Sequence, residues 1–78
     1  MSDIDMADVT LHIDENLDQA SRERLWNRIR GMDGVVAVAS HDDKPHLAVV
    51  EYNPDKVSSQ EILACAREEG VHAELIGL

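Results

Sequence analysis

The sequence predicts an α+β domain whose elements follow the order βαββαβ. Four stretches have strand character because apolar or β-branched residues alternate or run together over strand length: residues 8–13, 35–40, 46–52 and 71–76. Two intervening stretches have helix character, one with apolar residues at helical spacing and one opened by a capping box. Right-handed crossovers between strands joined by helices favour the split βαβ arrangement. We therefore expect a ferredoxin-like sandwich, with a four-stranded antiparallel sheet in the strand order 4-1-3-2 and both helices on one face.

An acidic loop separates the first strand from the first helix. Two of its residues, Asn16 and Asp18, are suitable helix N-caps. The buried stripe of the helix follows the i, i+4, i+7 spacing of Leu25, Ile29 and Met32. A turn with two glycines then ends the helix.

The second half of the chain repeats this logic. Residues 41–45 form a polar turn with a proline, so the flanking strands are a predicted hairpin. Residues 46–52 are apolar on both faces for most of their length, which is typical of a central strand. Ser58 and Glu61 form the capping box of the second helix, and Gly70 stands at its expected end.

Length and composition bound the domain. A chain of 78 residues is enough for one small domain, and we expect a flexible tail over 1–7 and a single domain over 8–78. Phe is absent, and there is one Trp and one Tyr, so the core must be aliphatic. The only cysteine, Cys65, falls on the inward stripe of the second helix, where it packs as a small hydrophobe; a reactive thiol is the alternative.

Charge and targeting signals limit the partners. Sixteen acidic against seven basic residues give a formal net charge of -9, which disfavours nucleic acid and anionic membrane surfaces. Such a field attracts cations or a basic protein surface. No basic leader or long apolar run is present, so we expect a cytoplasmic protein without a membrane span.

Three segments resemble the heavy-metal-associated domain family, the modules of copper chaperones and metal-transporting ATPases. M-D-G-V-V-A-V at 32–38 is similar to the family pattern L-x-G-V-x-x-V. V-E-Y-N-P-D-K-V-S-S-Q-E-I at 50–62 and G-V-H-A-E-L at 70–75 are similar to V-x-Y-D-P-x-x-V-S-x-E-E-L and G-Y-x-A-E-L. The resemblance covers roughly residues 9–75 and implies the same ferredoxin-like fold.

The resemblance fails at the metal-binding motif. The family binds soft metals through M-x-C-x-x-C between the first strand and the first helix. Counted back from Gly34, these positions fall on Asn16, Asp18 and Ser21. Copper(I) selects thiolate and thioether sulfur, so the family's metal site does not carry over to this chain.

A different ligand set is available at one end of the predicted sheet. The topology gathers six candidate ligands there: His12, His41, His46, His72, Asp14 and Asp18. His12 and His72 are expected to be partners across neighbouring strands. Imidazole and carboxylate suit zinc, nickel or copper(II), bound weakly; the alternatives are solvated strand ends or a pH-sensitive cluster.

Two surfaces are candidates for a protein partner. Trp26, with Arg22 and Arg30 on the same flank of the first helix, is either a binding hot spot or an edge of the core covered by the arginines. Leu47 and Val49 give the helix-free face of the sheet an apolar centre. That centre is either a homodimer or partner interface or a small solvated patch.

No nucleophile beside a base, phosphate loop or buried acid pair is present, so we expect no enzyme. The leading hypothesis is a protein-interaction or regulatory module without soft-metal binding and without a cofactor. The alternative is a heavy-metal-binding protein of metal homeostasis or transport that uses His, Asp and Glu ligands.

Overall fold

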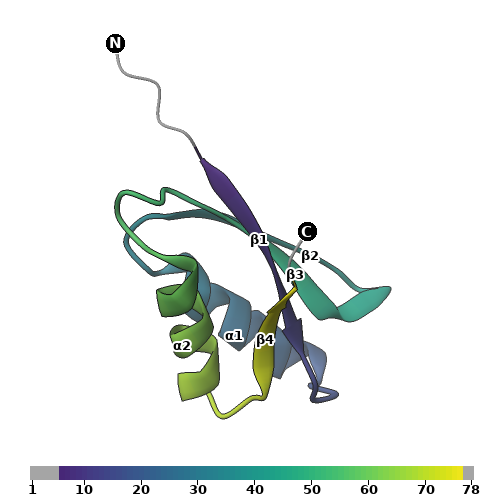
Figure 1. The fold of residues 1–78 in the computed structure, drawn as a ribbon. Helices are drawn as coiled ribbons and strands as arrows, with labels where there is room; N and C mark the ends of the chain where they lie inside the picture. Colours follow the sequence, from purple (N-terminus) through teal and green to yellow (C-terminus); the bar gives the residue numbers. More distant parts are fainter. Residues whose placement is uncertain (1–5, 77–78) are drawn as a thin grey trace.

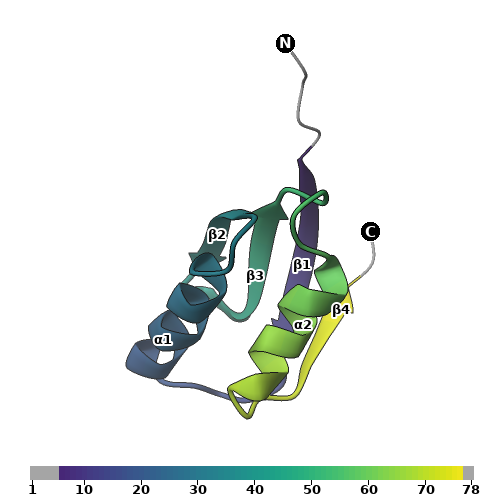
Figure 2. The same ribbon diagram turned by 90° about the vertical axis from the view of Figure 1, so that its left-hand side faces the viewer.

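A computed structural model describes residues 6–76 and confirms the predicted element order. The elements are β1 (Ala7–Ile13), α1 (Gln19–Arg30), β2 (Val35–His41), β3 (Lys44–Tyr52), α2 (Ser59–Glu68) and β4 (Ala73–Ile76). The strands form one sheet in the order β2-β3-β1-β4, with every neighbouring pair antiparallel. This is the predicted order read from the other edge. Both helices cover one face of the sheet, as Figures 1 and 2 show, and no other element of residues 6–76 covers the opposite face, which we call the open face.

The core lies between the helices and the inner face of the sheet. Alternation places Leu11 and Ile13 of β1 inward, where they meet Leu25 and Ile29 of α1 and Ile62 of α2. Cys65 is also buried in this cluster, in agreement with its predicted packing role. The remaining core is mostly aliphatic, as the composition requires.

Side chains cap the start of both helices. Of the two suggested caps of α1, Asp18 holds the position, and its carboxylate accepts a hydrogen bond from the backbone N–H of Ser21. The predicted capping box of α2 is present, since Ser58 Oγ accepts from the Glu61 N–H and the Glu61 carboxylate accepts from the Ser58 N–H.

Several boundaries differ from the predictions. Ala7 was expected in the tail but pairs with Tyr52 at the start of β1, while positions 1–5 of that predicted tail lie outside the described residues. The β2–β3 turn is shorter than 41–45, and Pro45 lies within β3. The β2–β3 register shifts beside it, which accommodates a residue without an N–H. Finally, β4 begins at Ala73, two residues later than expected.

Within residues 6–76, no helix has both the length and the apolar character needed to cross a membrane.

Candidate functional site

The loop between β1 and α1 does not offer soft ligands. Asn16 is exposed, and Asp18 and Ser21 are joined by the helix cap, with 2.8 Å between Asp18 Oδ1 and the Ser21 nitrogen. This hydrogen bond holds the pKa of Asp18 below its usual value, so the carboxylate stays ionised as a cap. Oxygen ligands and a backbone amide do not fit copper(I), which prefers sulfur.

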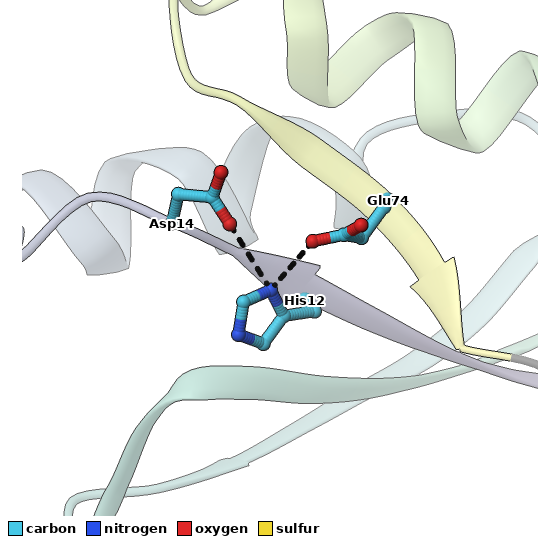
Figure 3. A group of neighbouring side chains, drawn as sticks. All are labelled: His12, Asp14 and Glu74. Atoms are coloured by element: carbon cyan, nitrogen blue, oxygen red, sulfur yellow. Dashed lines mark hydrogen bonds and ion pairs between the residues drawn. The ribbon is translucent and has the colours of Figure 1, made fainter.

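The structure brings two of the predicted ligands together with a third that was not predicted. His12 near the end of β1, Asp14 just beyond it and Glu74 on β4 form a group whose ligand atoms all lie within 4.8 Å of one another. His12 Nδ1 lies 3.1 Å from Glu74 Oε1 and 3.4 Å from Asp14 Oδ1. Figure 3 shows both carboxylates turned toward the imidazole. Strand pairing identifies Glu74, because it stands directly opposite His12 in the β1–β4 register.

The prediction that His72 faces His12 is wrong. β4 pairs with β1 only from Ala73, so Glu74 takes the place opposite His12. The backbone N–H of Asp14 instead donates to the His72 carbonyl at 2.9 Å.

His72 pairs with Glu15. His72 Nδ1 lies 2.7 Å from Glu15 Oε2, and the backbone N–H of His72 donates to the same carboxylate. The side-chain hydrogen bond, together with the charge of Glu15, raises the pKa of His72. The pKa of Glu15 is lowered mainly by the hydrogen bond from the His72 ring and, to a smaller extent, by the one from the His72 backbone. This pair ties the acidic loop to the start of β4.

The other two histidines play different parts. His46 Nδ1 lies 2.8 Å from the carbonyl oxygen of Ile13, and because a carbonyl only accepts, Nδ1 carries the proton. The His46 ring also stacks on His12, with ring centroids 6.0 Å apart. His41 lies at the exposed end of β2, and neither it nor Asp18 belongs to the His12 group.

The open face of the sheet has a row of aligned residues from all four strands, which is apolar except for the hydroxyl group of Thr10 on β1. Strand pairing aligns Val49 with Ala39 on one side and with Thr10 on the other, and Thr10 with Ile76. Val49 remains 43% exposed and Ile76 38% exposed. The predicted surface residue Leu47 is half-buried beside this row, and both Leu47 and Val49 line a shallow hollow of about 240 Å³. We refer to Ala39, Val49, Thr10 and Ile76 as the apolar row.

Acidic residues border the apolar row on both sides. Asp8 on β1 and Glu51 on β3 stand opposite each other in the strand register. Asp8 is two residues from Thr10, and Glu51 is two residues from Val49. On the other side, Glu74 lies two residues from Ile76 and accompanies Asp14 in the His12 group. The face therefore combines an apolar centre with a rim that is acidic at Asp8 and Glu51 and mixed on the other side, where Glu74 accompanies His12, His41 and Lys44.

Of the two alternatives for Trp26, the structure supports the core position and not an exposed binding hot spot. Trp26 is 1% exposed, although the helical spacing places it at the edge of the α1 stripe. The reason is that α1 packs against both β2 and α2, so its flank is covered as well as its inner side. Trp26 Nε1 is buried without a hydrogen-bond partner among the described residues.

The two arginines beside Trp26 bond to other groups. Arg22 donates to the carbonyl of Leu17 at 2.9 Å, and Arg30 donates to the carbonyl of Val38 on β2 at 3.1 Å. The Arg30 guanidinium also lies 4.0 Å from the Glu23 carboxylate on the same helix. These arginines bond α1 to the preceding loop and to β2, and they do not flank an exposed aromatic side chain.

Comparison with known proteins finds solved structures that have the same fold. No protein-family model matches the chain, and no curated protein matches it. Among solved structures, the copper binding domain from HMA7, a P-type ATPase, superposes with a TM-score of 0.81 at 16% identity, covering 90% of this chain and 93% of that chain. Oxidized MerP from Ralstonia metallidurans CH34 gives a TM-score of 0.81 at 21% identity, with 91% and 97% covered.

A third structure extends the comparison to a chaperone. The apo form of the HMA domain of the copper chaperone for superoxide dismutase superposes with a TM-score of 0.74 at 20% identity, covering 94% of this chain and 69% of that chain. At identities this low, the superpositions establish the fold alone, and the chemistry of the site has to be argued from the residues of this chain. The chain therefore has the ferredoxin-like fold of the heavy-metal-associated domains, as the three sequence segments predicted.

Proposed function

We propose that this protein is a non-enzymatic protein-interaction module that docks its partner on the open face of the sheet. The observation that supports this proposal is the apolar row, which crosses every strand and exposes Val49 and Ile76. Burying such side chains against a partner removes apolar surface from water, which is the main favourable term in protein association.

The rim of the face favours a basic partner. Asp8, Glu51 and Glu74 border the row, and the whole chain carries a net charge of -9. A second copy of this chain would bring the same negative field to the interface, and like charges at an interface are costly. A protein surface with an apolar centre and a lysine- or arginine-rich rim complements both features.

The first loop argues against copper(I) transport as the function of this chain. The neighbouring structures are described as a copper binding domain and as part of a copper chaperone. In this chain the corresponding loop holds Asn16, Asp18 and Ser21, and two of these form the helix cap. We therefore propose that the chain binds a protein partner, and that this binding has a regulatory role, instead of transferring a soft metal.

The test compares two charge-adding variants. Val49→Glu places a carboxylate in the middle of the apolar row, and Ala64→Glu places the same group on an exposed position of α2. Wild-type protein, with its tag removed, is used to capture proteins from a lysate of the cells that contain it. Each captured protein is then purified and titrated into ¹⁵N-labelled wild type. We expect amide shifts at Thr10, Val49 and Ile76, and binding that weakens as salt increases.

The variants decide the outcome. We expect Val49→Glu to weaken binding at least about tenfold, because it places an unpaired carboxylate in the apolar centre of the interface, while Ala64→Glu leaves binding unchanged. Equal binding by both variants, or shifts confined to the helices, contradicts the proposal. A wild type that sediments as a dimer, with Val49→Glu a monomer, assigns the face to a second copy instead.

A further inference from the structure

We propose that His12, Asp14 and Glu74 form a binding site for a divalent transition-metal ion of borderline softness, with Zn²⁺ as the representative ion. The site lies beside the apolar row and shares Glu74 with its rim. Asp14 belongs to the β1–α1 loop, but none of the three ligands is at Asn16, Asp18 or Ser21. It uses an imidazole nitrogen from β1, a carboxylate oxygen from Asp14 just after β1 and a carboxylate oxygen from β4.

The spacing of the ligand atoms suits a small four-coordinate ion. Two ligand atoms around a tetrahedral zinc, with bonds of roughly 2.0–2.2 Å, stand roughly 3.3–3.6 Å apart. His12 Nδ1 lies 3.4 Å from Asp14 Oδ1 and 3.1 Å from Glu74 Oε1. Since both carboxylates are on exposed side chains, small rotations bring all three atoms to the same ion.

The backbone fixes where these ligands meet. His12 and Glu74 are direct partners in the β1–β4 register, so their side chains leave the sheet on the same face. The Asp14 N–H continues the pairing by donating to the His72 carbonyl. The pair between Glu15 and His72 closes the loop against β4. Two of the ligands thus come from paired strands, and the third, Asp14, begins a loop that is tied to the residues before β4.

The imidazole is held in place by its neighbour. The His46 ring stacks on His12 with an angle of 24° between the rings, and His46 is itself held by the Ile13 carbonyl. Groups that orient a ligand contribute to metal affinity because they remove rotamer freedom before the ion arrives.

Charge favours a cation at this position. Over residues 6–76, Asp14 and Glu74 both contact the His12 ring, and neither carboxylate pairs with a lysine or arginine. A divalent ion therefore displaces no fixed basic side chain and offsets part of the negative field of the chain. Nitrogen and oxygen ligands select zinc, nickel, cobalt or copper(II) over copper(I).

The site opens to solvent on the same face as the apolar row. Three protein ligands leave a fourth position of a tetrahedral ion to water, and the half-exposed carboxylates allow water to reach it. Such a site is expected to bind less tightly than a closed four-ligand site.

The experiment uses the full chain without a histidine tag, stripped of metal by a chelator. Zinc chloride is titrated by calorimetry in a non-coordinating buffer, and the imidazole signals are followed by NMR. We expect one zinc ion per chain, with the His12 ring resonances shifting at stoichiometric metal. The two decisive variants are Glu74→Gln, which removes a ligand, and Glu51→Gln, which makes the same change on the same face outside the group.

We expect Glu74→Gln to weaken zinc binding at least about tenfold, because even the loss of a group that only orients a ligand costs roughly 10–100-fold. Glu51→Gln should bind as the wild type does, and Asp14→Asn provides a second ligand variant. Absence of stoichiometric binding by the wild type overturns the proposal, as does equal affinity of the two glutamine variants. Loss of binding in His72→Gln with retention in Glu74→Gln also overturns it, since the Glu15–His72 pair would then hold the ion.

Discussion

The Asp18 carboxylate accepts a hydrogen bond from the Ser21 backbone N–H, with 2.8 Å between the two atoms. Asp18 is the N-cap of α1 and Ser21 is its third residue. By sequence resemblance these are the two cysteine positions of the heavy-metal-associated domains. In the family, this three-residue spacing lets two thiolates converge on one ion. In this chain, the same spacing lets the Asp18 side chain satisfy an unpaired N–H at the helix start.

The double variant Asp18→Cys/Ser21→Cys should gain copper(I) binding. The fold places both thiols at a helix N-terminus, which favours the thiolate form and thus the soft ligands that copper(I) selects. The measurement is competition with a chromophoric copper(I) chelator under reducing conditions. We expect one copper(I) per double variant and no stoichiometric binding by the wild type.

The single variants and a Cys65→Ala background serve as controls for this experiment. Cys65 is buried, so it should contribute nothing in either background. Tight stoichiometric copper(I) binding by the wild type would contradict the assignment of the loop as a cap.

The strand order and the helix starts could be predicted because they depend on local signals. Alternation defines the faces of β1, and the capping box at Ser58 and Glu61 marks the start of α2 in four residues. Boundaries at Ala7 and Ala73 depend on how far a neighbouring strand extends, which alternation alone does not specify.

The candidate site could be predicted only in part. His12 and Asp14 were expected near the sheet end, but Glu74 was not, because its role depends on the register between β1 and β4. A shift of two residues in that register would have placed His72 opposite His12. The position of Trp26 was left open between core edge and surface for a related reason, since a helical wheel describes one helix and not the strand β2 beside it.

Trp26 should behave as a core residue with one unfavourable atom. Its Nε1 is buried without a partner in residues 6–76, and an unsatisfied buried donor costs about 1–3 kcal/mol. Trp26→Phe removes this donor and keeps an aromatic ring, so we expect its free energy of unfolding to stay within about 1.5 kcal/mol of wild type.

Trp26→Ala provides the comparison, with an expected loss of about 3–5 kcal/mol from the cavity it leaves. Urea unfolding followed by circular dichroism measures both variants. Equal destabilisation by phenylalanine and alanine would show that the indole nitrogen has a favourable contact.

Gly34 should tolerate alanine less well than Gly70. Both have left-handed backbone angles, with φ of 100° and 88°, so each alanine variant carries a strain of about 1–2 kcal/mol. An added Cβ at Gly34 would also stand 2.8 Å from Lys56 Cβ and 2.9 Å from Val57 Cγ1, whereas nothing lies within 4 Å at Gly70. The clash should add about 1–3 kcal/mol to the cost of Gly34→Ala, and thermal or urea unfolding of both variants tests the difference.

The Glu15–His72 pair should stabilise the fold most in a window of mildly acidic pH. The pKa of Glu15 is lowered from its usual 4.5, so its contribution is present above 4.5 and is lost as pH falls through the folded value. The pKa of His72 is raised from its usual 6.5, so its contribution is complete below 6.5 and is lost as pH rises through the folded value. Both contributions are therefore complete between these two values.

The measurement compares wild type with His72→Asn by urea unfolding in metal-free buffer at about pH 5.5 and about pH 8.5. We expect the wild type to exceed the variant in stability by more at the lower pH, since there His72 is charged and pairs with the Glu15 carboxylate, 2.7 Å away. His41→Asn is the matched control, because His41 is an exposed histidine outside the ion pairs of residues 6–76. A stability difference that is the same at both pH values for His72→Asn would mean that the hydrogen bond, and not the charge of the imidazolium, ties the acidic loop to β4.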